Sequence, residues 1–516
     1  MAYERQSSTL PPAQPSYILR GHTSQIHSVQ FARKNTRLIT GDADGWVVYW
    51  KLETKRALAV WQAHDGAILG TAEWARDKVL THGRDNNLRI WQIQAGDEYA
   101  LSTALPSEEP SGDRRTPWLL HTLPVNTLNF CAFSMCYAHA WGKSYGYENH
   151  DAATEASSNK ETSSILVAVP ARDDKMAEVY QFPEERLKFV IPRAQTKDTG
   201  MVMAIKLVNA TVSQHTFVIT GYEGGLTAVH LLPRDDSSAI RVAQLIYLSQ
   251  PHTQPILSLD VLPDATTYFT SGADATIAAH RIPIIAADMG DQNLAPNDPK
   301  VDDPPISVPS PTFEQIPVAG GDALDEADDP PISVPDDISA ETISFAKRPI
   351  TAAQSQHKDR KSGGLSSLLS DAPAPPKTSK AQELPLLAPA IEPAYKINNT
   401  KHAGQQSLSV RSDGRLFACG GWDSRVRVYS AKTLKEVAVL KWHKEGIYAV
   451  AFAILLEGTD SESNAETGAT ENMVGKMVKR ETGLNKLQRQ REEKMQVKHW
   501  VAAGAKDGKI SLWELF

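Results

Sequence analysis

The chain has 516 residues, of which 41% are hydrophobic and 22% charged, and its formal net charge is −7 at pH 7. This length suits several domains, or one repeat architecture with insertions, and the negative charge gives no overall reason to bind nucleic acid or an anionic membrane. No long apolar run or signal-peptide pattern occurs, which predicts a soluble intracellular protein. The three cysteines, Cys131, Cys136 and Cys419, form no CxxC pair, so neither a disulfide framework nor a zinc site is predicted.

The first predicted elements are a short strand at 17–19 and a unit with the ordered residues His22, Thr40, Asp44 and Trp50. The segments beside Asp44 are short and rich in β-branched and aromatic residues, as strands are. An EF-hand loop is excluded, because placing a glycine at its sixth position puts a lysine where calcium needs a glutamate. The stretch therefore predicts a β-turn, with Asp44 as the buried partner of His22 and Asp42 facing solvent.

The same plan recurs along the chain. Residues 64–91 repeat it with His64, Thr81, Asp85 and Trp91, and Asp again follows Thr by four residues and precedes Trp by six. Three partial copies contain His252, Thr270 and Asp274; His402, Asp423 and Tyr429; and His443, Asp507 and Trp513. Two weaker copies lie around Asp174 and Tyr180 and around Thr220 and His230, which makes seven units.

The repeated residues resemble those of the WD-repeat family, whose units of about 40–45 residues form four-stranded propeller blades. This resemblance implies an all-β, seven-bladed propeller in which His, Ser or Thr, Asp and Trp form a hydrogen-bonded tetrad within a blade. Residues 17–516 would form the propeller after a flexible N-terminus (1–16), and the strand at 17–19 would close the ring, since an open array leaves unpaired edges. Because buried imidazole and carboxylate groups must be paired, the tetrads are predicted to be structural, and no catalytic, cofactor-binding or metal site is expected.

Three blocks do not fit a blade and are predicted to be insertions. They are 138–162, the Pro/Asp/Ser-rich and disordered 283–390, and the charged 457–497. The middle block contains DDPPISVP twice, which indicates either a local duplication or a docking motif. The basic segment 474–498 predicts a helix or mobile loop, with a contact to acidic protein or nucleic acid as the alternative. All three insertions are expected on one face of the propeller, since they lie between strands a and b or c and d of their blades. The other face keeps short loops, such as 84–86 and 422–424, and is free for a protein partner.

Three longer stretches refine the resemblance: PSYILRGHTSQIHSVQF at the start, LSVRSDGRLFACGGWDSRVRVY after the large insertion and VAAGAKDGKISLWELF at the end. They are similar to the fungal ASTRA-associated protein 1 family and to Gβ-like WD-repeat proteins. The resemblance implies a non-enzymatic scaffold of the ASTRA complex, in the nucleus and also in the cytoplasm, involved in chromatin remodelling and in assembly of phosphatidylinositol-3-kinase-related proteins. The implied partners are Tel/Tti-type cochaperones, RuvB-like AAA ATPases and a kinase or pseudokinase of that class, without direct nucleic-acid or membrane contact. The alternatives are a substrate receptor of a cullin-type ubiquitin ligase and a Gβ-like signalling scaffold.

Overall fold

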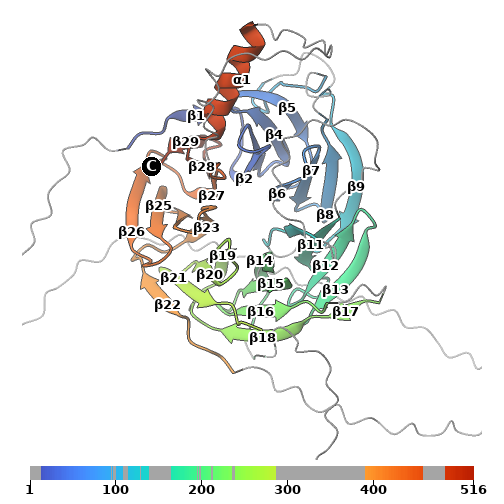
Figure 1. The fold of residues 1–516 in the computed structure, drawn as a ribbon, viewed down its shortest axis with the longest axis vertical. Coiled ribbons are helices and arrows are strands. Elements are labelled where there is room, and N and C mark those ends of the chain that lie inside the picture. The colour runs from blue at the N-terminus through green and yellow to red at the C-terminus, as the bar shows by residue number, and fades with distance from the viewer. Residues whose placement is uncertain are drawn as a thin grey trace, which may run out of the picture. The chain divides into compact units, whose positions relative to one another are not determined.

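The computed structural model describes residues 13–138, 164–285, 390–456 and 483–515, apart from 95, 97–99, 109–113, 128–129, 195, 197–198, 211–212 and 235–238. The described parts of residues 1–289 and 386–516 belong to one compact unit, and a second unit, 290–385, lies outside the described residues. The first unit is a ring of seven β-sheets, one per blade, as predicted (Figure 1).

Strand order in each sheet follows the plan of a propeller blade, with strand a at the centre of the ring and strand d at the rim (Figure 1). Blade 1 contains β2 (Ile26–Ala32), β3 (Arg37–Asp42), β4 (Trp46–Lys51) and β5 (Arg56–Gln62). Blade 2 contains β6 (Ile68–Trp74), β7 (Lys78–Gly83), β8 (Asn87–Gln92) and β9 (Trp118–Pro124). Blade 3 contains β10 (Ser134–Tyr137), β11 (Ile165–Pro170), β12 (Ala177–Phe182), β13 (Arg186–Ile191) and a fifth strand, β17 (Arg241–Val242).

The remaining blades follow in chain order. Blade 4 contains β14 (Val202–Ala210), β15 (His215–Tyr222), β16 (Thr227–Leu231) and β18 (Gln244–Ser249). Blade 5 contains β19 (Ile256–Val261), β20 (Thr267–Gly272), β21 (Thr276–Arg281) and β22 (Lys396–Asn399). Blade 6 contains β23 (Gln405–Val410), β24 (Leu416–Gly421), β25 (Arg425–Ser430) and β26 (Glu436–Lys441). Blade 7 contains β27 (Ile447–Phe452), β28 (Trp500–Ala505), β29 (Ile510–Glu514) and β1 (Tyr17–Leu19).

The N-terminal strand closes the ring, which confirms the sequence prediction. Strand β1 pairs antiparallel with β29, with Tyr17 opposite Leu512 and Leu19 opposite Ile510. Leu19 is 1% exposed and packs into the apolar cluster between blades 7 and 1. The first and last strands of the chain therefore complete one sheet and, with it, the ring.

The hydrophobic core consists of seven clusters, and each cluster lies between two neighbouring blades. In the cluster between blades 1 and 2, Trp61 and Trp91 pack edge to face with ring centroids 6.1 Å apart. The middle strand β11 is buried on both faces, in keeping with its continuous apolar sequence, and β3 is buried almost throughout although it carries polar Thr40 and Asp42. Removing the apolar surface of one blade therefore weakens its contacts with both neighbours.

Side-chain hydroxyls join the inner strands of adjacent blades. Leu408 donates its N–H to Ser258 Oγ at 3.0 Å, and Val450 does the same to Ser407 Oγ at 3.0 Å. Ser28 Oγ and Thr71 Oγ1 lie 2.8 Å apart across blades 1 and 2. These bonds satisfy polar groups along the channel wall and fix the spacing of the blades.

The three predicted insertions correspond to the connections β10–β11, β21–β22 and β27–β28. Of these stretches, 139–162 and 286–389 lie outside the described residues, so the predicted disorder of 283–390 stays a prediction. In the third stretch, helix α1 (Gly483–Gln496) lies beside blade 1, where Glu492 and Lys51 form an ion pair at 3.1 Å. The Asn35 side chain donates to the Gln496 carbonyl at 3.0 Å and anchors the end of α1.

Candidate partner-binding site

The predicted tetrad of blade 2 is complete. His64 Nδ1 lies 2.8 Å from Asp85 Oδ1, and Nε2 lies 2.7 Å from Thr81 Oγ1, which also accepts the Trp91 indole N–H at 2.9 Å. Both ring nitrogens have a suitable partner if His64 is neutral, because Nδ1–H then donates to the Asp85 carboxylate and Nε2 accepts from the Thr81 hydroxyl. Burial lowers the pKa of His64, which outweighs the opposite effect of Asp85.

Blade 1 has the same network, but with a different aspartate from the one predicted. His22 Nδ1 lies 2.7 Å from Asp42 Oδ2, and Nε2 lies 2.8 Å from Thr40 Oγ1, which accepts the Trp50 indole N–H at 2.8 Å. Asp42 is 0% exposed, whereas Asp44 lies on the surface. The prediction that Asp44 pairs with His22 and that Asp42 faces solvent was therefore wrong.

The reason lies in the residue two positions after the strand-b threonine. Blade 2 has Gly83 there, and a Cβ atom on it would meet the His64 ring at 2.3 Å, so this position faces the imidazole directly. In blade 1 that position carries Asp42, whose Oδ2 atom reaches His22, so the Asp44 side chain has no role in the network. The other carboxylate oxygen of Asp42, Oδ1, accepts the backbone N–H groups of Asp44 and Trp46 at 3.0 and 2.9 Å and thereby caps the predicted turn.

Blade 5 has a complete network in which histidine replaces tryptophan. His252 lies 2.9 Å from both Asp274 Oδ1 and Thr270 Oγ1, as predicted. His280 Nε2 lies 3.3 Å from the same Thr270 oxygen, and its Nδ1 lies 3.0 Å from the Tyr247 hydroxyl. Burial lowers the pKa of His280 to about 3, so the ring is neutral and both nitrogens have partners.

Blade 7 takes its hydroxyl from another strand. His443 Nε2 lies 2.7 Å from Ser511 Oγ, and Trp513 donates its indole N–H to the same oxygen at 2.8 Å. Asp507 lies 3.8 Å from His443 and bonds Lys509 at 2.7 Å instead. Ser511 was not predicted, because the motif places the hydroxyl on strand b, although a serine two residues before the tryptophan was a visible signal.

Blade 6 does not form the predicted tetrad. His402 is exposed, and its ring lies 3.8 Å from Asp423, which instead binds Arg427 at 2.6 and 3.1 Å. In blades 1, 2, 5 and 7 the histidine stands four residues before strand a, whereas His402 stands three before Gln405, so its side chain leaves the blade. Tyr429 is buried, but its hydroxyl has no hydrogen-bond partner among the described residues.

The tetrads recur in separate blades, and their histidine and threonine side chains are buried. Both features are typical of structural groups, whereas nucleophilic catalysis uses one constellation that a substrate can reach. Burial also raises the pKa of the Cys131 and Cys419 thiols. Within the described ranges, no group of three or more His, Cys, Asp or Glu side chains could hold a metal ion, and no helix is long and apolar enough to cross a membrane.

The best candidate for a functional surface is the mouth of the central channel. A cavity of about 560 Å³ opens there, between the starts of the a strands of all seven blades. Its wall is mostly uncharged and includes Leu69, Phe133, Leu257, Gln406 and Tyr448. Such a cavity can hold one or a few side chains of a partner protein.

Exposed aromatic rings stand at the rim of this cavity. Phe130 is 58% exposed and lies under the Arg84 guanidinium, which is 4.3 Å from the ring centroid. Trp422 is 49% exposed, and its indole N–H donates to Gln406 Oε1 at 2.9 Å, which fixes the ring at the rim. Aromatic and arginine side chains are enriched at the energetic centres of protein interfaces. The turn 422–424 was predicted as part of a free face, but the role of Trp422 was not, although a tryptophan in a short turn was a usable signal.

His27 lies deeper in the same cavity and packs edge to face on Tyr448, with ring centroids 5.6 Å apart. Burial lowers the pKa of His27, and nearby Arg84 adds to this against the opposing effect of Asp42. Lys206 and Asp260 neutralise one another at 2.7 Å. The wall therefore carries little net charge, so the cavity favours an apolar or uncharged side chain over an ion.

Comparison with known proteins gives one consistent result. The model of a family described as ASTRA-associated protein 1 matches residues 15–513. The chain is 36% identical to ASTRA-associated protein 1 of Aspergillus niger and 36% identical to that of Pyricularia oryzae, in both cases over 98% of each chain. It is also 25% identical to the protein of that name from Schizosaccharomyces pombe, over 85% of this chain and 93% of the relative.

Proposed function

Because the chain belongs to the ASTRA-associated protein 1 family, we propose that it is a subunit of the ASTRA complex and acts there as a scaffold without catalysing a reaction. The observation that carries this proposal is the family match over residues 15–513, which spans all seven blades. A propeller fold alone is compatible with many functions, so the family supplies the specific role. The closed ring supports it, because a rigid disc can hold several proteins in fixed positions.

The finer part of the proposal concerns the clients. We propose that the complex takes part in chromatin remodelling and in the assembly of phosphatidylinositol-3-kinase-related proteins, in the nucleus. The proposed partners are Tel/Tti-type cochaperones, RuvB-like AAA ATPases and a kinase or pseudokinase of that class. The channel mouth is the proposed contact surface, because Phe130 and Trp422 expose large rings there beside a preformed cavity.

Affinity purification of the full-length tagged chain, followed by mass spectrometry, tests this function. We expect Tel/Tti-type and RuvB-like proteins to be enriched over a purification with the tag alone. Recovery of cullin and its adaptors without those proteins would instead identify a ubiquitin-ligase receptor and overturn the proposal. Fluorescence imaging of the tagged chain at its native level tests nuclear localisation, and exclusion from the nucleus contradicts it.

A pair of matched variants tests the contact surface. Trp422→Ala removes an exposed ring at the channel mouth, and Trp118→Ala removes one that is 74% exposed on β9 at the rim of the ring. We expect Trp422→Ala to reduce partner recovery about tenfold, and Trp422→Ala combined with Phe130→Ala to reduce it further, since hot-spot aromatics contribute about 2 kcal/mol or more each. Trp118→Ala should leave partner recovery unchanged. Equal recovery with both proteins, at unchanged melting temperature, would remove the channel mouth from the proposal.

A further inference from the structure

Segments of the chain itself cover the outer strands of several blades. Strand β17 adds to the outer strand of blade 3, with Phe189 opposite Arg241. In blade 1, Val60 of the outer strand donates its N–H to the Ser102 carbonyl at 2.8 Å. In blade 4, Glu392 donates to Leu248 at 2.8 Å. These contacts show that the rim of this propeller accepts extended chain.

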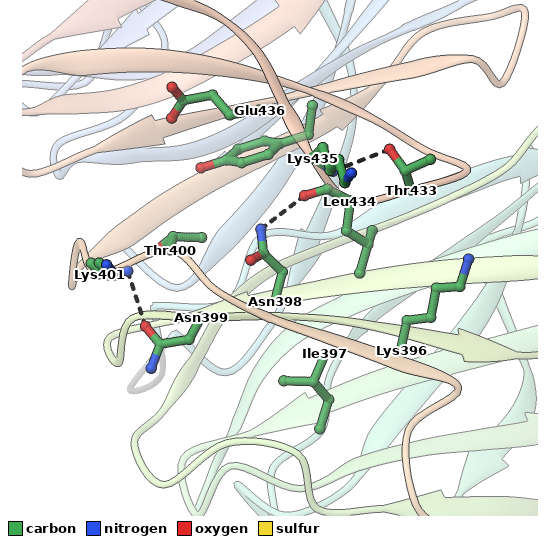
Figure 2. A pocket seen from close by; sticks show the side chains of 11 residues that line it. Lys396, Ile397, Asn398, Asn399, Thr400, Lys401, Thr433, Leu434, Lys435 and Glu436 are labelled. Carbon is green, nitrogen blue, oxygen red and sulfur yellow. Dashed lines mark hydrogen bonds between the residues drawn. The ribbon is translucent and has the colours of Figure 1, made fainter. Parts of the chain in front are cut away.

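The outer strand of blade 5 has no such cover among the described residues, and a groove runs beside it. Strand β22 is the last strand in its sheet, and residues 396–401 form one wall of a groove of about 580 Å³. The other wall is the turn that leads into β26, residues 433–436 of blade 6 (Figure 2). The Asn398 side chain crosses the gap and donates to the Leu434 carbonyl at 2.8 Å, which joins the two walls (Figure 2).

The charge of the groove is predominantly positive. Lys396 and Lys401 lie on the β22 wall and Lys435 on the opposite wall, whereas Glu436 is the one acidic residue of the lining. Glu436 is also within 3.4 Å of Arg427, which offsets its charge. Figure 2 shows the lysines spread along the groove rather than gathered at one point. The arrangement favours a ligand with several negative charges along its length.

An equivalent groove elsewhere in the ring shows that a further segment of the chain can line such a space. Between blades 7 and 1, residues 17–20 of the outer strand face the turn that leads into β5. Trp50 and Tyr429 occupy equivalent places in the two grooves, and Lys55 and Leu434 share a left-handed backbone with φ of 57°. The groove between blades 7 and 1 is also lined by Thr103, Leu105 and Glu108 of the chain itself.

The segment that lines the groove between blades 7 and 1 supplies one apolar and one acidic side chain, and it turns where Glu108 donates its N–H to the Leu105 carbonyl at 2.9 Å. Leu105 packs against the apolar cluster between blades 7 and 1, and Ser107 donates its N–H to the Gly21 carbonyl at 3.0 Å. The groove between blades 5 and 6 has the same walls and more lysines, but no such segment lines it in the part of the chain that the structure describes.

We propose that the groove between β22 and the turn before β26 binds an extended, acidic segment of a partner protein. The elongated wall of residues 396–401 fits extended chain, in which alternate side chains lie about 6–7 Å apart on one face. Asp or Glu side chains of the partner face the lysines, and an apolar side chain packs beside Leu434, as Leu105 does in the equivalent groove. This site deepens the proposed scaffold role and rests on it only for the identity of the partner.

Fluorescence anisotropy with the purified full-length protein tests the groove. The probe is a labelled short peptide with a central Leu flanked by Asp and Glu, and the control peptide has Asn and Gln in their places. The test variant is Lys401→Glu with Lys435→Glu, two exposed residues that line the groove. The control variant is Lys441→Glu with Lys444→Glu, two exposed residues outside the lining with the same change in net charge.

We expect the acidic probe to bind the wild type and the control variant equally, and the groove variant about tenfold more weakly, because attraction becomes repulsion on both walls. Added salt should weaken binding, because the lysines are exposed and screened. Equal binding by all three proteins, or equal binding of both peptides to the wild type, overturns the proposal. The peptide assay uses no other subunit, so a negative result in it would not contradict the scaffold role. Absence of ASTRA partners from the affinity purification would, in turn, not contradict peptide binding in the groove.

Discussion

Replacing Asp42 by alanine should destabilise blade 1 far more than replacing Asp44. The Asp42 carboxylate accepts three hydrogen bonds, from His22 Nδ1 and from the backbone N–H groups of Asp44 and Trp46. An unsatisfied buried donor costs about 1–3 kcal/mol, and the imidazole is the most deeply buried of the three. Water can reach the turn and solvate the two backbone groups in part. We therefore expect Asp42→Ala to lower the free energy of unfolding by about 3 kcal/mol.

Asp44→Ala is the matched control, because the same atoms are removed two residues away. The Asp44 side chain is exposed and contributes no contact to the network, so the expected change is below about 0.5 kcal/mol. Guanidinium denaturation at pH 7, followed by tryptophan fluorescence, measures both variants under identical conditions, and Trp50 reports on the affected blade. Equal midpoints for the two variants, or a larger loss with Asp44→Ala, would refute the assignment of Asp42 as the partner of His22.

Three further predictions concern closure, pH and the last blade. Leu19→Ala should cost about 2–5 kcal/mol, because it opens a cavity where blades 7 and 1 meet, whereas Tyr17→Ala at the 40% exposed end of β1 should cost less in the same denaturation assay. Burial lowers the pKa of His82 to about 3, so the unfolded chain takes up this proton first and the stability that His82 contributes falls as the pH drops below about 6.5. The share of this one group in the loss at pH 5 should be about 2 kcal/mol, so His82→Leu, but not His402→Leu, should reduce the slope of unfolding free energy against pH. Ser511→Ala leaves His443 and Trp513 without their shared oxygen and should lower the unfolding free energy by about 1–3 kcal/mol, and a change below about 0.5 kcal/mol would contradict its place in the network.

The fold was predictable because it depends on the spacing of the tetrad residues, which can be read from the sequence. Seven units with motif residues in a similar order, two of them with all four tetrad residues, indicate the blades, and the strand at 17–19 matches the missing outer strand of the last blade. The tetrad of blade 2 and the network of His252, Thr270 and Asp274 were also correctly predicted. In these blades the residue count and the side-chain geometry agree.

Where the predictions failed, the count did not determine the direction of the side chain. Asp42 and Asp44 both lie near His22 in sequence, and only the backbone of the turn decides which carboxylate enters the blade. His402 is one residue out of register with the other tetrad histidines, and that shift turns it toward solvent. The turns 84–86 and 422–424 indicated the face of the channel mouth, but the cavity itself was not predicted, because it brings together residues from seven blades that share no local pattern.

The pairing of β1 with β29 also has a consequence for how the chain folds during synthesis. Blades 1 to 6 can form in order as the ribosome releases them, but blade 7 needs Tyr17–Leu19 beside β29, which is made after the other six blades. Until then the earliest strand has no sheet to join, and the apolar side of blade 1 that later meets blade 7 stays uncovered. Long-range pairings of this kind form late and slowly, and exposed apolar surface promotes aggregation meanwhile. The nascent protein should therefore depend most on chaperones between completion of the first blade and release of the last strand.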